Sequence, residues 1–415
     1  MRRWGIVALA LAVSACNGGI VPRPEGPPVR PAAPARTPVP ATPIAPVPAT
    51  ATPGAVSAIR VGVTAGPSLG SLALSPDQAT RALAAFRLSC PSLMRRPDLS
   101  GLTRGADWQP ACAAAADVRG DARGFFAQWF ETVQVGDGKA FATGYYEPEI
   151  AGSRERRAGY EVPVYARPDD LVEVDLGLFS TDLKGKKIRG RIEGNAFVPY
   201  YDRAAIDDGA LGSHARIIAW AADPAEFFFL QIQGSGRLRL PDGSVIRVGY
   251  DSQNGHDYTG IGALMKQRGL LGPGQTSMQG ILKWIHEHPD EGRNIMHEDK
   301  SFVFFRVLDG PPIGAMGLAV TPRVSAATDP RFVPLGAPVF LSMDRADASG
   351  LWVAQDTGGA IRGSNRFDTY WGAGDDARAA AGGMASHGTA FVLLPIGTLD
   401  RLAAERANGG ASPNP

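Results

Sequence analysis

Short apolar runs separated by glycine and proline dominate the C-terminal part of the chain. They lie at residues 301–305, 334–341, 351–354 and 391–395. Runs of this length bounded by turn residues predict β-strands. Several short strands that close on one another are typical of a small β-barrel.

The N-terminal and middle parts of the chain predict helices on either side of a group of short strands. Residues 75–96 begin with Ser-Pro-Asp, a helix-start signal, and residues 122–130 carry aromatic side chains at core spacing. Residues 260–290 also predict helices, the last ended by Pro289. Between them, residues 162–249 predict short strands, with a hairpin turn at Asp242-Gly243, and a polar loop follows.

Residues 226–236 begin apolar and end polar, and we interpret them as a buried strand. On a strand, Gln231 and Gln233 share one face. Paired amides followed by Gly234-Ser235-Gly236 suit the hydroxyl and N-acetyl groups of a sugar. The alternative is the ordinary polar outer face of a strand.

The N-terminus predicts export. Two arginines precede the apolar residues 5–13, which are too short to span a bilayer, and residues 13–16 (Val-Ser-Ala-Cys) resemble a lipobox ending at Cys16. An ordinary secretory signal is the alternative. We expect a signal peptide at 1–16, with Asn17 favouring the outer membrane, and a Pro/Ala-rich, extended linker at 17–57.

Composition excludes several classes of protein. The net charge is +1 and no basic tract is present, which argues against nucleic-acid binding.

Cys90 and Cys112 form an isolated pair in an exported chain, which predicts a disulfide. Metal binding is not expected, because His286 and His288 are two apart and do not share a helix face.

Acidic residues near glycine turns and aromatic side chains are the candidate chemistry. Asp356 ends an apolar run before Thr-Gly-Gly, Asp368 lies among aromatic residues, and Asp375-Asp376 follows Gly374. A carboxyl in an apolar setting keeps its proton near neutrality, as glycan cleavage requires. The alternative is that these acids form turns and a helix cap.

A set of ordered motifs resembles the MltA family of membrane-bound lytic transglycosylases over residues 75–396. The motifs are Thr-Gly-Tyr-Tyr-Glu-Pro at 143–148, Phe-Leu-Gln-Ile-Gln-Gly-Ser-Gly at 229–236, Gly-Tyr at 249–250 with Asn-Gly at 254–255, Phe-Phe at 304–305, Thr-Pro-Arg at 321–323, Pro-Leu-Gly at 334–336 and the three-aspartate segment from Asp356 to Gly374. Ala326-Ala327 departs from the polar or branched residues we expect there, and either Asp375 or Asp376 fills the third acid position.

The resemblance implies a mainly β fold: a double-psi β-barrel formed by residues 301–415 with a helical part at 58–145, and a second β-barrel inserted at 146–300. A groove between them would hold a peptidoglycan glycan strand. It further implies non-hydrolytic cleavage of the β-1,4 bond between N-acetylmuramic acid and N-acetylglucosamine, which leaves a 1,6-anhydro end. No cofactor is implied, and cell-wall synthesis or division proteins are conceivable partners.

Roles follow from the matched motifs. The resemblance makes Asp368 the acid and base, with Asp356 supporting it, and we expect Phe367 or Trp371 to supply an apolar wall that raises the pKa of Asp368. The residues expected to contact glycan are Thr143, Tyr145, Tyr146, Glu147, Gln231, Gln233, Gly234, Ser235, Gly236 and Asp375. Two alternatives stay open: a true glycoside hydrolase, and a non-catalytic glycan-binding lipoprotein.

Overall fold

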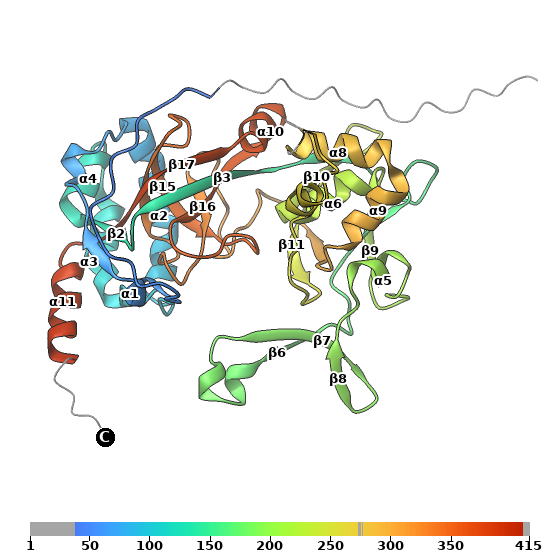
Figure 1. Cartoon of the computed structure of the whole chain (residues 1–415), viewed down its shortest axis with the longest axis horizontal. Coiled ribbons are helices and arrows are strands. Elements are labelled where there is room, and N and C mark those ends of the chain that lie inside the picture. The colour runs from blue at the N-terminus through green and yellow to red at the C-terminus, as the bar shows by residue number, and fades with distance from the viewer. Residues whose placement is uncertain (1–37, 273–274, 276, 410–415) are drawn as a thin grey trace, which may run out of the picture. The chain divides into compact units, whose positions relative to one another are not determined.

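A computed structural model describes residues 38–272, 275 and 277–409 (Figure 1). The expected signal peptide, Cys16 and the first part of the linker lie outside the described residues. In the part of the chain that is described, no helix combines the length and apolar character needed to cross a bilayer.

The larger sheet contains a closed ring of strands. Its order is β1-β2-β17-β14-β15-β13-β16-β3, and β17 also pairs with β3, so six strands from β17 to β3 form a barrel. This confirms the predicted barrel for the later C-terminal strands. The strand predicted at residues 301–305 is not one of them, because residues 303–307 pair within the second sheet. The strands are β1 (Val63–Ala65), β2 (Phe130–Val135), β3 (Lys139–Glu147), β13 (Ser325–Thr328), β14 (Pro338–Met343), β15 (Gly350–Asp356), β16 (Arg366–Ala373) and β17 (Ala385–Pro395).

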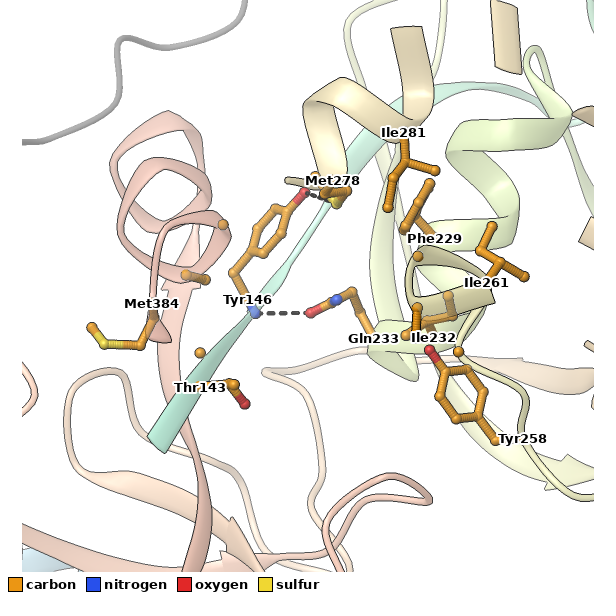
Figure 2. A pocket seen from close by; sticks show the side chains of 16 residues that line it. Thr143, Tyr146, Phe229, Ile232, Gln233, Tyr258, Ile261, Met278, Ile281 and Met384 are labelled. Carbon is orange, nitrogen blue, oxygen red and sulfur yellow. Dashed lines mark hydrogen bonds between the residues drawn. The ribbon is translucent and has the colours of Figure 1, made fainter. Parts of the chain in front are cut away.

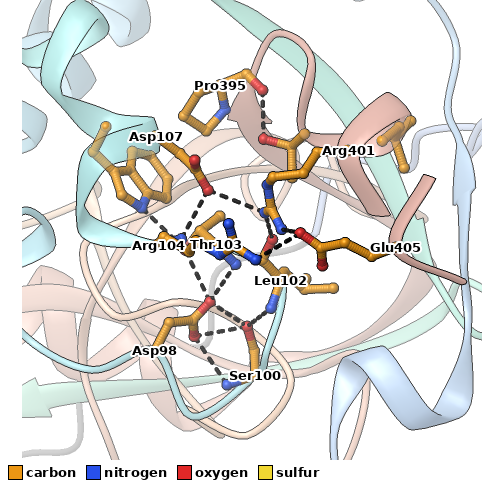
Figure 3. A network of polar contacts seen from close by, with 12 residues as sticks. Asp98, Ser100, Leu102, Thr103, Arg104, Asp107, Pro395, Arg401 and Glu405 are labelled. Atoms are coloured by element: carbon orange, nitrogen blue, oxygen red, sulfur yellow. Dashed lines mark hydrogen bonds and ion pairs between the residues drawn. The ribbon is translucent and has the colours of Figure 1, made fainter. Parts of the chain in front are cut away.

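Helices pack on this barrel through one large hydrophobic core. They are α1 (Ala58–Val61), α2 (Pro76–Leu93), α3 (Gly105–Asp117), α4 (Ala122–Trp129), α10 (Asp375–Gly382) and α11 (Thr398–Gly409). The Ser75 side chain caps α2, and a Cys90–Cys112 disulfide joins α2 to α3, as predicted. An ion-pair network that includes Arg401 and Asp107, 3.0 Å apart, ties α11 to α3 (Figure 3).

A second sheet has its own core. Its order is β12-β11-β10-β4-β9-β5, and the edge strands β12 and β5 contact each other without pairing. The turn at Asp242-Gly243 joins β10 to β11, as predicted. The strands are β4 (Glu149–Ser153), β5 (Val162–Tyr165), β9 (Ile217–Ala221), β10 (Ser235–Arg239), β11 (Val245–Gln253) and β12 (Val303–Val307).

Helices and a small third sheet complete this part of the chain. The helices are α5 (Arg203–Asp207), α6 (Pro224–Gln233), α7 (Ile261–Gln267), α8 (Met278–Glu287) and α9 (Pro289–His297), and the third sheet consists of β6 (Val172–Asp175), β7 (Lys187–Glu193) and β8 (Ala196–Pro199). Pro289 follows the end of α8, as predicted, and also starts α9. The loop expected after residue 249 is wrong at its start, because β11 continues to Gln253.

The strand predicted within residues 226–236 is wrong, because residues 224–233 form α6. The Asp223 side chain accepts a hydrogen bond from Glu226 N, Pro224 occupies the first turn, and Gly234 ends the helix at φ +75°. These are helix boundary signals, and a short apolar run alone does not distinguish a strand from a helix. Gln231 and Gln233 therefore do not share a face.

The linker prediction fails for residues 38–57, which lie against the barrel. Ala41 N donates to Asp344 O at 2.9 Å, and Ile44 N donates to Ser342 Oγ at 2.8 Å. Val47 exchanges two hydrogen bonds with the buried Gln134 carboxamide. A proline-rich segment lacks many amide donors, yet its remaining amides and apolar side chains, Ile44 among them, are enough to dock it.

Candidate active site

The barrel places the two predicted catalytic acids on strands either side of β13. Ala327 aligns with Asp356 of β15 and with Asp368 of β16. Aligned residues of neighbouring strands point to the same side of a sheet, and strands lie about 4.8 Å apart. Both carboxylates therefore project from one face, with backbones about 10 Å apart. The small Ala327 side chain lies between them, buried in a hydrophobic cluster.

Asp368 is half-buried, and among the described residues its carboxyl group accepts one hydrogen bond. Thr143 Oγ1, on the neighbouring strand β3, donates to Asp368 Oδ1 at 2.6 Å, and Arg366 Nη2 donates to Thr143 Oγ1 at 2.9 Å. Among the described residues, none donates to Oδ2. Burial raises the pKa of Asp368 to about 6, the nearby Asp356 adds to the rise, and Thr143 and Arg366 oppose it.

Asp356 is held by three donors. Ala315 N and Thr357 N donate to Oδ1 at 2.8 and 2.9 Å, and the Tyr145 hydroxyl donates to Oδ2 at 3.0 Å. Burial raises the pKa of Asp356, while these hydrogen bonds lower it. Because both oxygens already accept hydrogen bonds, Asp356 is suited to remain in place as a charge rather than to exchange a proton.

The apolar wall around Asp368 differs from the one we predicted. Phe367 and Trp371 pack in the main barrel core, and strand alternation turns the Phe367 side chain away from that of Asp368. Tyr370 shares the Asp368 face and packs against Tyr145, with ring centroids 5.0 Å apart and ring planes tilted by 38°. Both belong to a small hydrophobic cluster that also contains Ala327. This cluster accounts for the burial of the acid.

A pocket of about 330 Å³ lies next to Thr143 (Figure 2). Gln233 Oε1 accepts a hydrogen bond from Tyr146 N at 3.1 Å within it. Neither aspartate lines the pocket, and Thr143 is the residue that contacts both the pocket and Asp368. The lining residues are Thr143, Gly144, Tyr146, Phe229, Ile232, Gln233, Tyr258, Gly260, Ile261, Gly262, Ala263, Met278, Ile281, Ala381, Gly382 and Met384.

Strand alternation directs the two adjacent tyrosines to opposite faces of β3. Tyr145 reaches Asp356, whereas Tyr146 lines the pocket and directs its hydroxyl to Met278 Sδ at 3.7 Å. Of the predicted contact residues, Thr143, Tyr146 and Gln233 line the pocket, and Tyr145 lies at the acids.

Other predicted contact residues lie elsewhere. Gln231 is buried: its Oε1 accepts from Arg203 Nη1 at 2.5 Å and its Nε2 donates to Val303 O at 3.1 Å, so both ends of the amide are held inside the protein. Glu147 is also buried and pairs with Arg247 at 2.7 Å. Both predictions of glycan contact fail for the same reason: these side chains are buried against internal partners and do not reach the surface.

The glycine and serine positions have structural roles. Gly234 ends α6 in a left-handed conformation, and Ser235 is buried at the start of β10. A side chain at Gly236 would meet Leu230 Cδ1 at 2.3 Å. Asp375 is exposed in the first turn of α10, a position that favours an acid whether or not it meets a ligand.

Sequence reasoning missed Arg366 and Tyr258. Arg366 lies two positions before Asp368 on one strand, and this spacing alone indicates a shared face. Tyr258 lies outside any regular element, where no periodicity predicts a side-chain direction.

One group of described residues has metal-ligand spacing. Ligand atoms of Asp169, Asp170 and His214 lie within 4.8 Å of one another. These ligand atoms already make contacts within the protein. His214 Nδ1 lies 2.9 Å from Asp169 Oδ1, and the Tyr200 hydroxyl donates to Asp170 Oδ1 at 2.6 Å. None of the three lines the pocket.

Comparisons with known proteins agree with this arrangement. The model of the MltA specific insert domain matches residues 141–306, and that of the 3D domain matches residues 324–394. The chain is 32% identical over 263 residues to membrane-bound lytic murein transglycosylase A of Escherichia coli (strain K12). That match covers 60% of this chain and 64% of the relative, slightly less than two thirds of its length.

Solved structures match over a larger share of the chain. MltA from Neisseria gonorrhoeae, in a monoclinic form, is 36% identical with a TM-score of 0.68, over 85% of this chain and 97% of that one. A membrane-bound lytic murein transglycosylase from Agrobacterium tumefaciens is 28% identical with a TM-score of 0.71, over 83% and 99%. Since both parts of the chain match in sequence and in fold, the chain belongs to the MltA family of membrane-bound lytic murein transglycosylases.

Proposed function

We propose that this chain is a peptidoglycan lytic transglycosylase. It would cleave the β-1,4 bond between N-acetylmuramic acid and N-acetylglucosamine without water and leave a 1,6-anhydromuramic acid end. The observation that carries the proposal is the Asp368 carboxyl, which has one oxygen without a hydrogen bond among the described residues and a pKa of about 6. Such a group is protonated in a useful fraction of molecules near neutral pH.

Asp368 acts first as an acid and then as a base. Its proton passes to the glycosidic oxygen as the bond from that oxygen to C1 breaks, and positive charge develops at C1. The C6 hydroxyl of the same muramic acid attacks C1, and the ionised Asp368 accepts the hydroxyl proton. The acid is thereby restored without a water molecule.

Asp356 supports this step by charge. Its carboxylate projects from the same face as Asp368, and its negative charge raises the pKa of the acid. The hydrogen bond from Tyr145 and the two backbone donors keep it from moving toward the sugar. A fixed anion on this face also stabilises positive charge at C1.

Glycan binding is assigned to the pocket beside Thr143. Tyr146, Tyr258 and Phe229 offer faces on which sugars stack, and Gln233 offers an amide to an N-acetyl group. We assign the helical part and the barrel to residues 58–145 and 301–415, and the inserted sheet to residues 146–300, except that β12 (Val303–Val307) forms an edge of the inserted sheet.

The envelope is the proposed location. The named relatives are membrane-bound, and residues 13–16 carry the lipobox pattern. Lipid attached to Cys16 would hold the chain at the outer membrane, within reach of peptidoglycan strands.

The test is digestion of purified sacculi, with mass spectrometry of the soluble products. We expect anhydro-muropeptides from the wild type and none from Asp368→Asn, which keeps the size of the side chain but cannot donate the acid proton. Asp400→Asn is a matched control, because it changes an exposed acid in the first turn of α11 that neither lines the pocket nor belongs to the three-aspartate segment. Products one water heavier would indicate a hydrolase instead. Binding to sacculi without products would indicate a glycan-binding protein.

A further inference from the structure

The third sheet exposes an apolar face that no described part of the chain covers. No side chain of residues 172–199 belongs to any of the hydrophobic core clusters. Six of the sixteen exposed large hydrophobic side chains of the described chain lie in this segment: Val172, Leu178, Phe179, Ile188, Ile192 and Phe197. We call residues 172–199 the arm.

Strand register sorts the arm into an apolar face and a charged face. Val172 aligns with Gly190, Val174 with Ile188, and Ile192 with Phe197, so these residues project from one side. A side chain at Gly190 would meet Phe197 Cζ at 2.7 Å, so glycine lets that ring lie across the strand.

The opposite face carries ion pairs. Glu173 binds Lys187 at 2.6 Å and Arg189 at 2.7 Å, and Arg189 lies against Gly255 of the neighbouring loop. The charged face therefore turns toward the body of the protein, and the apolar face is the one without a partner among the described residues.

The turn at the end of β6 is the most apolar exposed point. Leu178 and Phe179 are 84% and 76% exposed, the two highest values among large hydrophobic side chains of the described chain. Lys184 and Lys186, both exposed, follow within the same turn region. Apolar side chains next to lysines match the two layers of a bilayer surface, acyl chains below and anionic headgroups above.

We propose that the arm docks on an anionic phospholipid membrane through Leu178 and Phe179, with Lys184 and Lys186 at the headgroups. This rests on the lipid anchor proposed at Cys16. The 21 residues from 17 to 37 separate that cysteine from the first described residue, and fully extended they span at most about 75 Å. The anchor therefore keeps the chain close to a bilayer. A weak contact between the arm and that bilayer is then enough to orient the chain on the membrane.

The test uses the full lipidated chain in phosphatidylglycerol-containing vesicles. A fluorophore is attached at Thr181→Cys, next to the apolar turn, or at the exposed Ala404→Cys of α11 as a matched control. The disulfide holds Cys90 and Cys112, and lipid holds Cys16, so the added thiol is the one available. We expect a nitroxide on the acyl chains to quench the probe at 181 at least threefold more than the probe at 404.

Two further variants make the test specific. Leu178→Ser with Phe179→Ser should remove the difference between the two probes, and Lys184→Gln with Lys186→Gln should reduce it several-fold. Equal quenching at both positions in vesicle-bound protein would overturn the proposal. So would a probe at 181 that is shielded from water but not quenched, because a protein surface would then cover it. Failure of the whole chain to sediment with vesicles would refute the anchor, whereas glycan cleavage is measured separately.

Discussion

Thr143 Oγ1 donates a 2.6 Å hydrogen bond to Asp368 Oδ1, and this contact joins the pocket to the proposed acid. A donor to the carboxylate favours its ionised form, and it opposes the burial that keeps the proton on. Thr143 therefore lowers the pH at which the Asp368 carboxyl loses its proton, against the larger effect of burial.

Replacing Thr143 should shift this balance in a known direction. Thr143→Val removes the donor and should move the alkaline limb of the pH–rate profile upward by about one pH unit, since a hydrogen bond to a charged group contributes about 1.5 kcal/mol or more. Thr143→Ser keeps the hydroxyl donor, so the alkaline limb of its profile should stay at the wild-type pH. Profiles of anhydro-muropeptide release measure both, and a limb that moves equally in the two variants would assign the effect to packing.

The wild-type profile has its own expected form. A general acid works while protonated, so kcat/KM should fall about tenfold per pH unit above the pKa of about 6. Arg366→Gln removes a positive charge that lowers this pKa and should move the fall to higher pH. Arg366→Lys retains the charge and is the control. Activity that stays constant from pH 6 to 8 would exclude Asp368 as the acid.

Strand positions could be predicted from sequence because apolar runs bounded by glycine have few alternatives. The run before Asp356 is buried throughout as β15, and the acid stands at its end, as predicted. Residues 227–230 are a case in which such a run does not predict the structure. They are apolar without alternation, which fits a strand or a helix, and the capping hydrogen bond to Asp223 favours the helix.

The details of the site depend on pairing between distant strands. Asp356 and Asp368 share a face because both align with Ala327, and no local pattern specifies that register. The small residue that departs from our sequence expectation is the one that separates the acids. Likewise, the sequence predicts that Gln231 binds a sugar, but in the structure its carboxamide oxygen accepts a hydrogen bond from Arg203.

Asp368 should also affect stability, with a sign opposite to that of a salt-bridged acid. Its folded pKa of about 6 exceeds the ordinary value, so the folded state binds more protons between pH 4 and 6. The stability this provides is present below pH 4 and is lost as pH rises through 6. At pH 8, Asp368→Asn should therefore gain about 1–3 kcal/mol over the wild type, and less at pH 4. Urea unfolding at both pH values measures this, and an equal difference at the two would contradict the buried charge.

The disulfide between α2 and α3 should contribute to stability. It joins residues separated by 22 positions, and closing such a loop stabilises by about 3 kcal/mol in the chain-entropy model. Cys90→Ala with Cys112→Ala should lower the free energy of unfolding by that amount. Reductant should lower the Tm of the wild type and leave that of the double variant unchanged. A wild-type Tm that does not respond to reductant, in protein with confirmed free thiols, would contradict this role.

The docked segment 38–57 should be part of the folded unit rather than a spacer. Removing it takes both Val47 hydrogen bonds from the Gln134 carboxamide and leaves the one to Gly136 O, and each lost hydrogen bond costs about 0.5–1.5 kcal/mol. It also uncovers core that Ile44, Ala51 and Ala55 contact. A chain that begins at residue 58 should therefore be at least 3 kcal/mol less stable than one that begins at residue 38. Restoring residues 38–57 alone should recover the difference, because the contacts lie within them. Equal denaturant midpoints for the two chains would show that residues 38–57 do not stabilise the fold and act as a linker.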